Sequence, residues 1–155
     1  MTDETTLEAL RAQENEFVFD SFDQATAWAV GSAAVDVITE RGLSLAVQIV
    51  LRDHVVFKAA IGGVAPDTDE WLTGKALTAR HFDQASLHIR FRKDADPSFL
   101  DGLDGLDQEV YKTHGGSVPI RVAGEGTVGT ITCSGEPDLV DHAVAIEALR
   151  RVILK

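Results

Sequence analysis

The sequence predicts an α/β domain of the α+β type, in which helices cover a central antiparallel sheet. Residues 43–61 and residues 118–134 each have the pattern of a strand, a turn and a second strand, with helical patterns between them and at both ends of the chain. Tight turns join antiparallel strands, whereas parallel strands need a long crossover connection. Two hairpins separated by helices therefore indicate an antiparallel sheet with helices packed against it.

The N-terminal region predicts a short helix followed by a brief extended segment. From Thr5 to Glu16, Leu7 and Leu10 lie three residues apart among good helix formers. Phe17-Val18-Phe19 then has the pattern of a short strand or of a hydrophobic staple into the next helix.

A longer helix is expected to begin after 21–23 and to end at Gly42, because Ser21 and Asp23 are good N-cap residues and glycine is common just after a helix. Residues spaced by four are expected to line its packing face, namely Ala25, Ala29, Ala33 and Val37, with Trp28, Val30, Ala34 and Ile38 beside them. Small side chains on this face would let the helix approach the sheet closely.

The middle of the chain predicts a hairpin, a helix and a loop. The apolar runs 43–51 and 55–61 are separated by the polar residues 52–54, which predicts two paired strands. A helix is expected over residues 70–90, in one piece or two. Residues 92–107 are polar and rich in turn formers, so they predict a loop or lid with at most one helical turn.

The C-terminal third predicts a second hairpin and a final helix. Val118–Val122 and Thr127–Ser134 are joined by Gly124-Glu125-Gly126, and polar and apolar residues alternate in the second of these runs. Pro137 favours a helix start, and acidic residues in the first turn with basic residues at the end agree with the helix dipole.

Gly124–Gly129 matches the G-x-G-x-x-G pattern of dinucleotide-binding loops. That motif requires a helix N-terminus after the glycines to hold the pyrophosphate. Here alternating branched residues continue into a strand, so the segment predicts a glycine-rich hairpin turn instead.

Length and composition indicate one domain over residues 1–155 with a real core, since 45% of the residues are hydrophobic and 25% are charged. The net charge is 14 − 25 = −11, which repels phosphate backbones and anionic lipid headgroups. We therefore expect neither nucleic acid nor a membrane as a partner.

The chain is expected to be cytoplasmic. Its longest apolar runs fall far short of the roughly 20 residues that span a bilayer, and the first 15 residues carry acids where a signal peptide carries bases. A single cysteine, Cys133, allows no internal disulfide, which agrees with a reducing compartment.

His114-Gly115-Gly116-Ser117 is the most suggestive segment for binding. Two glycines allow a ligand to approach the backbone closely, and a neighbouring histidine can titrate, donate a hydrogen bond or bind a metal. The alternative is that the glycines only bend the chain into the next strand. A serine-hydrolase triad of Ser117 or Ser134 with Asp141 and His142 is disfavoured, because no G-x-S-x-G elbow occurs.

The five histidines show no H-x-x-x-H or H-E-x-x-H spacing, so the sequence predicts no firm metal site. His114 and His142 remain the candidate metal ligands. His142 is expected in the first turn of the last helix, where the dipole disfavours its protonated form.

Several segments together resemble a known family. They are Gln13-Glu14 with the aromatics of 17–22, Ala27-Trp28, Gly62–Trp71 leading to Lys75 and Arg80, Tyr111–Ile120, Gly126–Thr130, and Ser134-Gly135 through Asp141-His142 to Leu149. In this order they resemble the UPF0303 family of the haem-degrading domain superfamily, which includes GlcG-like and HbpS-like proteins. The blocks HGGS-P and GTVGT are the specific parts of this resemblance.

The resemblance implies a profilin-like or GlcG-like domain with a sheet of about five strands, assembled into dimers or larger rings. It also implies haem or tetrapyrrole binding. For the carboxylates of such a ligand, the groups to consider are Lys75, Arg80 and the amides of Gly115 and Gly116. Gly74 stands where the family commonly has a basic residue.

Three classes of function are left open. The first is an oligomeric binding protein for haem or another small anionic ligand, with His114 as the contact and Lys75 and Arg80 as charge partners. The second is an enzyme, for haem cleavage or hydrolysis, that uses His114 as a base oriented by Asp107 or Glu109. The third is an oligomeric scaffold that acts through a partner surface without a ligand.

A homo-oligomer is also indicated by the large aromatics near the N-terminal half, which are Phe17, Phe19, Phe22, Trp28 and Trp71. Aromatic surface at a domain edge often meets a partner subunit. The alternative is that these rings close the core beneath the first helix.

Overall fold

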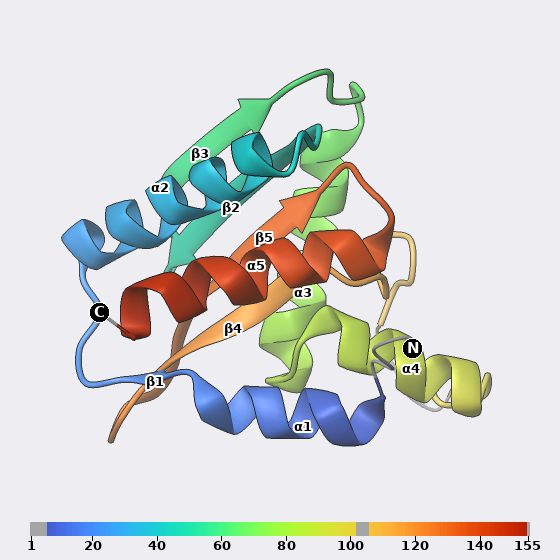
Figure 1. Ribbon diagram of the computed structural model, residues 1–155. Helices are drawn as coiled ribbons and strands as arrows, with labels where there is room; N and C mark the ends of the chain where they lie inside the picture. Colours follow the sequence, from blue (N-terminus) through green and yellow to red (C-terminus); the bar gives the residue numbers. More distant parts are fainter. Residues whose placement is uncertain (1–5, 102–105, 155) are drawn as a thin grey trace.

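The computed structural model describes residues 6–101 and 106–154 (Figure 1). Its elements are α1 (Leu7–Glu16), β1 (Val18–Phe19), α2 (Gln24–Glu40), β2 (Leu45–Leu51), β3 (His54–Ile61), α3 (Thr68–Phe82), α4 (Ser86–Ala95), β4 (Ser117–Val122), β5 (Gly126–Ser134) and α5 (Asp138–Ile153). Thr5, the expected start of the first helix, lies outside the described residues. Thr6 caps this helix instead, by accepting a hydrogen bond from the Ala9 amide at 3.1 Å.

The described residues form a five-stranded sheet in the order β1-β4-β5-β2-β3. Both predicted hairpins are present, as the antiparallel pairs β2–β3 and β4–β5, and β2 also pairs with β5 antiparallel. The expectation of a wholly antiparallel sheet is wrong in one place, because β1 pairs with β4 in parallel, Val18 opposite Arg121. Tight turns fix the direction of hairpin strands only, and β1 is joined to its neighbour by most of the chain.

Helices cover the two faces of the sheet differently. Helices α2 and α5 lie side by side over one face, and α3 crosses the other behind the sheet (Figure 1). Gly31 of α2 sits directly on Phe57 of β3, since a Cβ at this position would overlap the phenyl ring. The absence of a side chain is therefore what lets α2 approach β3.

The predicted packing face of α2 is confirmed for Val30, Ala34, Val37 and Ile38 and is wrong for Ala25 and Ala29. The buried residues are Ala27, Val30, Gly31, Ala34, Val37 and Ile38, whereas Ala25 and Ala29 are exposed. Burial of Val30, Val37 and Ile38 gains more free energy than burial of Ala25 and Ala29 would. Asp23 and Gly42 cap the helix as expected, with Gly42 at φ 64°.

The long helix expected over residues 70–90 occurs as two helices. It breaks at Asp83, whose φ of 54° places it in the left-handed region. The loop prediction is wrong at its start, because α4 continues to Ala95. The Arg92 guanidinium lies 4.0 Å from the centre of the Phe99 ring, so the last turn of α4 contacts the segment that follows it. The polar sequence did not predict this contact. Residues 102–105 of the expected loop lie outside the described residues.

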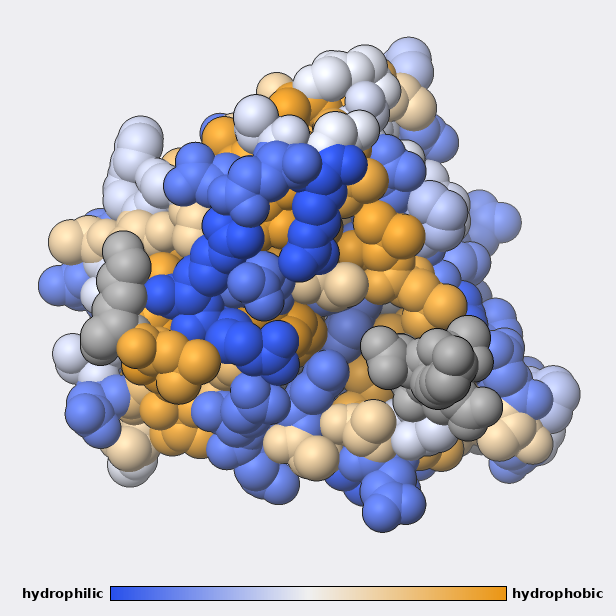
Figure 2. Space-filling model, viewed as in Figure 1, coloured by the Kyte–Doolittle hydropathy of each residue, from blue (hydrophilic) through white to orange (hydrophobic). Residues whose placement is uncertain are grey.

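The early aromatic residues divide into two groups. Phe17 and Phe19 are buried, and Phe22 packs edge-on to Phe19 with ring centres 5.0 Å apart, so these rings close the core. Trp28 is 60% exposed on α2 and contacts Phe57 edge-on. On the face shown in Figure 2, hydrophobic and hydrophilic residues are interspersed.

Among the described residues, the helices are all too short or too polar to cross a lipid bilayer.

Candidate functional site

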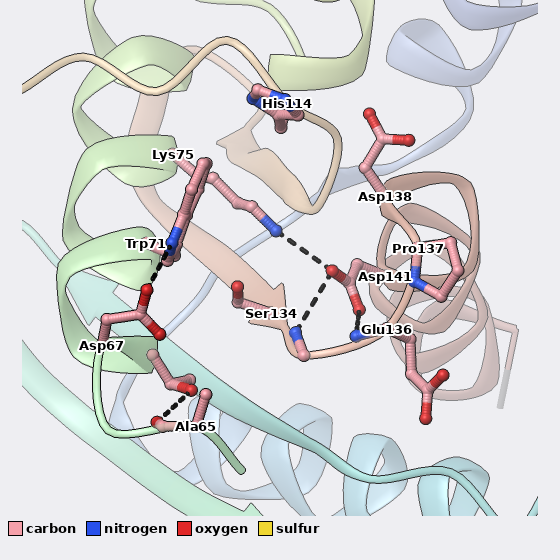
Figure 3. A pocket seen from close by; sticks show the side chains of 12 residues that line it. Ala65, Asp67, Trp71, Lys75, His114, Ser134, Glu136, Pro137, Asp138 and Asp141 are labelled. Carbon is pink, nitrogen blue, oxygen red and sulfur yellow. Dashed lines mark hydrogen bonds and ion pairs between the residues drawn. The ribbon is translucent and has the colours of Figure 1, made fainter. Parts of the chain in front are cut away.

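A pocket of about 450 Å³ lies where the start of α3, the segment before β4 and the junction between β5 and α5 meet. Its lining includes Trp71 and Lys75 from α3, His114 from the segment before β4, and Asp138 and Asp141 from the first turn of α5 (Figure 3). The volume falls in the range of pockets that hold small molecules.

Lys75 and Asp141 form a buried ion pair at the base of this pocket. The Lys75 ammonium lies 3.1 Å from Asp141 Oδ2, and the two side chains are only 3% and 1% exposed. Lys75 also donates a hydrogen bond to the Cys133 carbonyl at 3.1 Å. Figure 3 shows the Lys75 side chain reaching from α3 toward Asp141. The pair therefore ties α3 to the end of β5 and to α5.

Two backbone amides hold the Asp141 carboxylate from the other side. Gly135 N–H donates to Oδ2 at 3.3 Å and Glu136 N–H donates to Oδ1 at 3.0 Å. Burial raises the pKa of Asp141, while the Lys75 charge and these amides oppose that rise. Because its charge is matched inside the protein, Lys75 is a poor partner for an incoming anion.

His114 lies at the rim of the pocket with an exposed side chain. Its ring meets Trp71 edge-on with centres 5.1 Å apart, and Lys112 Nζ lies 4.9 Å from the centre of the same indole. Asp67 Oδ2 accepts a hydrogen bond from Trp71 Nε1 at 3.3 Å. Partial burial lowers the pKa of His114, and the Asp138 charge opposes this change. The lowered pKa favours the neutral imidazole.

Gly115 and Gly116 are needed for close packing at this site. The Gly115 amide donates to Asp138 Oδ2 at 2.9 Å, and the Arg90 guanidinium holds Oδ1 of the same carboxylate at 2.5 Å. A Cβ on Gly116, whose φ is 139°, would overlap the Cys133 carbonyl oxygen and approach Lys75 Nζ. The two glycines therefore bend the chain into β4 and also bring His114 to the pocket.

The other predicted site residues lie elsewhere. Ser117 is fully buried in β4, where its hydroxyl pairs with that of Thr132 at 2.8 Å. Arg80 lies at the far end of α3 and forms an exposed ion pair with Asp53 at 2.9 Å. Asp107 and Glu109, proposed to orient His114, line a different depression beside Gly74.

His142 and His88 are buried where α1 packs on the rest of the protein. His142 Nε2 contacts Gln13 Oε1 at 2.9 Å, and His88 Nδ1 contacts Glu14 Oε1 at 3.0 Å. Burial lowers the pKa of His142 to about 4. Within the described ranges, groups of three or more His, Cys, Asp or Glu side chains suited to a metal ion do not occur.

Sequence reasoning missed three residues of this pocket, which are Trp71, Asp138 and Asp141 in these roles. Trp71 and Lys75 are four apart on a helix, and Asp138 and Asp141 are three apart, so each pair shares a helix face. This spacing is the feature of the sequence that could have identified these pocket residues. The contact between the two pairs depends on the tertiary fold.

Comparison with known proteins places this geometry in context. Residues 22–150 match the family described as "Haem degrading protein HbpS-like". A UPF0303 protein of Burkholderia orbicola (strain MC0-3) is 39% identical over 143 residues, which cover 92% of this chain and 87% of that protein.

Two solved structures show the same fold. The Ybr137w protein superposes with a TM-score of 0.88 at 25% identity, covering 98% of this chain and 90% of that one. A complex of PduOC with heme superposes with a TM-score of 0.70 at 22% identity, covering 86% and 94% of the two chains.

Proposed function

This chain belongs to the HbpS-like haem-degrading protein family, and from that premise we propose that it binds haem or a related tetrapyrrole in the pocket between α3 and α5. The observation that carries the proposal is His114, an exposed imidazole at the rim of the pocket beside Trp71. The relative PduOC, solved as a complex with heme, lends support through the shared fold.

The chemistry of the donor set fits this group. A neutral imidazole is the form that coordinates iron, and partial burial lowers the pKa of His114 and so favours that form. Trp71 offers an aromatic surface for a flat macrocycle. His88 and His142 are poorer candidates, because their rings are buried and each has one nitrogen engaged by α1.

The propionates are expected to lie on the side of His114 rather than at Lys75. Lys75 is neutralised by Asp141, and Asp67 and Glu136 add negative charge to the opposite side of the pocket. Lys112 lies over Trp71 near His114 and pairs at 3.4 Å with Glu70, whose side chain is exposed, so a propionate can replace this partner more easily than it can replace the buried Asp141. The proposal therefore replaces Lys75 and Arg80, as charge partners, with Lys112.

The test is a haemin titration of the full chain, followed at the Soret band. Wild type is expected to bind saturably with one haem per chain. His114→Ala is expected to weaken binding by about tenfold or more, as for loss of a contact worth at least ~1.4 kcal/mol. His54→Ala, which removes another exposed histidine, is the matched control and is expected to bind like wild type.

Binding that does not saturate, or that is equal in wild type and His114→Ala, would refute the proposal.

Light scattering on the same samples measures the number of subunits in the assembly. A homo-oligomer is part of the proposal, and the 60% exposure of Trp28 on α2 supports it, because large exposed aromatics are common at subunit interfaces.

A further inference from the structure

A second, smaller depression lies at the other end of α3, beside the β2–β3 turn and the β4–β5 hairpin. Its volume is about 200 Å³, and its lining includes the side chains of Arg52, Arg80 and Asp83. We propose that this depression binds a phosphate group, either free phosphate or the phosphate of a small molecule. The proposal is independent of haem binding.

The backbone around this depression is unusual. Among the described residues, Arg52 at φ 56° and Asp83 at φ 54° are the two non-glycine residues in the left-handed region, and both line it. Aspartate tolerates this conformation, whereas arginine gains nothing there that glycine or asparagine would not supply at lower cost. Strained residues of this kind gather at functional sites.

The ion pair of Arg52 does not explain why arginine occupies this turn. Its guanidinium lies 3.6 Å from Glu125, and the two side chains are 63% and 55% exposed. Exposed pairs of this kind contribute little to stability. The Arg52 amide donates to the Val128 carbonyl at 2.7 Å, which fixes the turn against β5, and Arg52 lines the depression.

The local charges favour an anion despite the acidic chain. Among the described residues, Arg80 forms an ion pair with Asp53, an exposed side chain that does not line the depression. Asp83 is the acid in the lining, and its carboxylate already accepts hydrogen bonds from Thr127 Oγ1 and from Arg121 Nη2. The charge of Asp83 is thus matched by Arg121, and the two arginines that line the depression, Arg52 and Arg80, pair with the exposed acids Glu125 and Asp53, which lie outside its lining.

Phosphate suits this arrangement better than a single carboxylate. Guanidinium groups bind oxyanions through two parallel hydrogen bonds, and two arginines match the double charge of phosphate. Thr127 and Gly129 of the glycine-rich hairpin also line the depression. This segment is no dinucleotide loop, yet it lies in the wall of the proposed phosphate site.

The two sites point in different directions from one helix. Lys75 and Arg80 are five residues apart, so they leave α3 about 140° apart around its axis. Lys75 lines the larger pocket near the start of α3, and Arg80 lines the smaller depression near its end. This separation explains why Lys75 and Arg80 do not form one anion site.

The test is calorimetric titration of the full chain with inorganic phosphate at low ionic strength, with glycerol 2-phosphate and acetate as parallel ligands. Wild type is expected to bind phosphate saturably, more tightly than acetate. Tighter binding of glycerol 2-phosphate would identify a phosphomonoester as the ligand, and equal or weaker binding would identify free phosphate. Arg80→Gln is expected to weaken phosphate binding by about tenfold or more.

Arg52→Asn tests whether the Arg52 side chain itself contributes to phosphate binding. It is expected to weaken phosphate binding by a similar factor and also to raise the thermal midpoint, because asparagine suits the left-handed conformation. Arg41→Gln changes an exposed arginine at the end of α2 and is expected to leave binding unchanged. Phosphate binding that is absent, that does not saturate, or that is equal in wild type and Arg80→Gln overturns the proposal.

Discussion

Replacing Lys75 by methionine is expected to destabilise the protein strongly at neutral pH. The substitution keeps the length of the side chain but removes the charge partner of the Asp141 carboxylate, which is 1% exposed and keeps the Gly135 and Glu136 amides as hydrogen-bond donors. Breaking a buried pair from one side costs about 3–5 kcal/mol. For a chain of this size, that loss lowers the thermal midpoint by about 6–20 °C.

The pH dependence of this effect has a definite sign. Burial already raises the pKa of Asp141, and loss of the Lys75 charge raises it further. Protonation then relieves the buried charge in the folded state, so the deficit of Lys75→Met relative to wild type shrinks as pH falls from 7.5 to 5.

Lys58→Met provides the matched control. Lys58 forms an ion pair with Asp69 at 2.8 Å, a distance similar to that of the buried pair, but the two side chains are 42% and 73% exposed. Its loss is expected to cost less than about 1 kcal/mol in urea or thermal unfolding. Equal effects of Lys75→Met and Lys58→Met would show that burial does not control the strength of these pairs, and the reasoning would fail.

Two further predictions concern His142 and Gly116. The pKa of His142 is lowered to about 4, so the unfolded chain takes up a proton between about pH 6.5 and pH 4 that the folded protein does not. Stability is therefore expected to fall by about 3 kcal/mol over this range on acidification, and urea titrations of His142→Gln, compared at several pH values, should lack this component. Gly116→Ala is expected to cost on the order of 2–4 kcal/mol, because φ is 139° and a Cβ would overlap the Cys133 carbonyl oxygen. Gly63→Ala, where a Cβ meets open space, should be nearly neutral in the same thermal melts.

Local patterns in the sequence were sufficient for most of the fold. The hairpins, the caps Asp23 and Gly42, and the final helix depend on residues close together in the chain, so turn and cap chemistry predicted them. The parallel pairing of β1 with β4 has no local signature. The buried face of α2 was predicted only in part, because Ala29 and Val30 differ in what they meet across the sheet rather than in periodicity.

The candidate site was predictable only where local sequence patterns define it. The HGGS segment stood out as a glycine-bounded histidine, and His114 does lie at a pocket. Asp141 could not be identified as the partner of Lys75, since the two are joined only by the packing of α3 against β5 and α5. Arg80 looked like a neighbour of Lys75 in sequence, but helix geometry sends it to the other end of α3.

The pairing of β1 with β4 has a consequence for the order in which the chain folds during synthesis. Val18 and Phe19 must wait for Arg121 and Val122 to emerge from the ribosome, whereas β2 and β3 can close their hairpin as soon as Ile61 is made. Closing the long loop between β1 and β4 also costs more entropy than closing the hairpin. The segment of α1 and β1, although translated early, is therefore expected to dock last, and a fusion at this end acts on the final step of folding rather than on its nucleus.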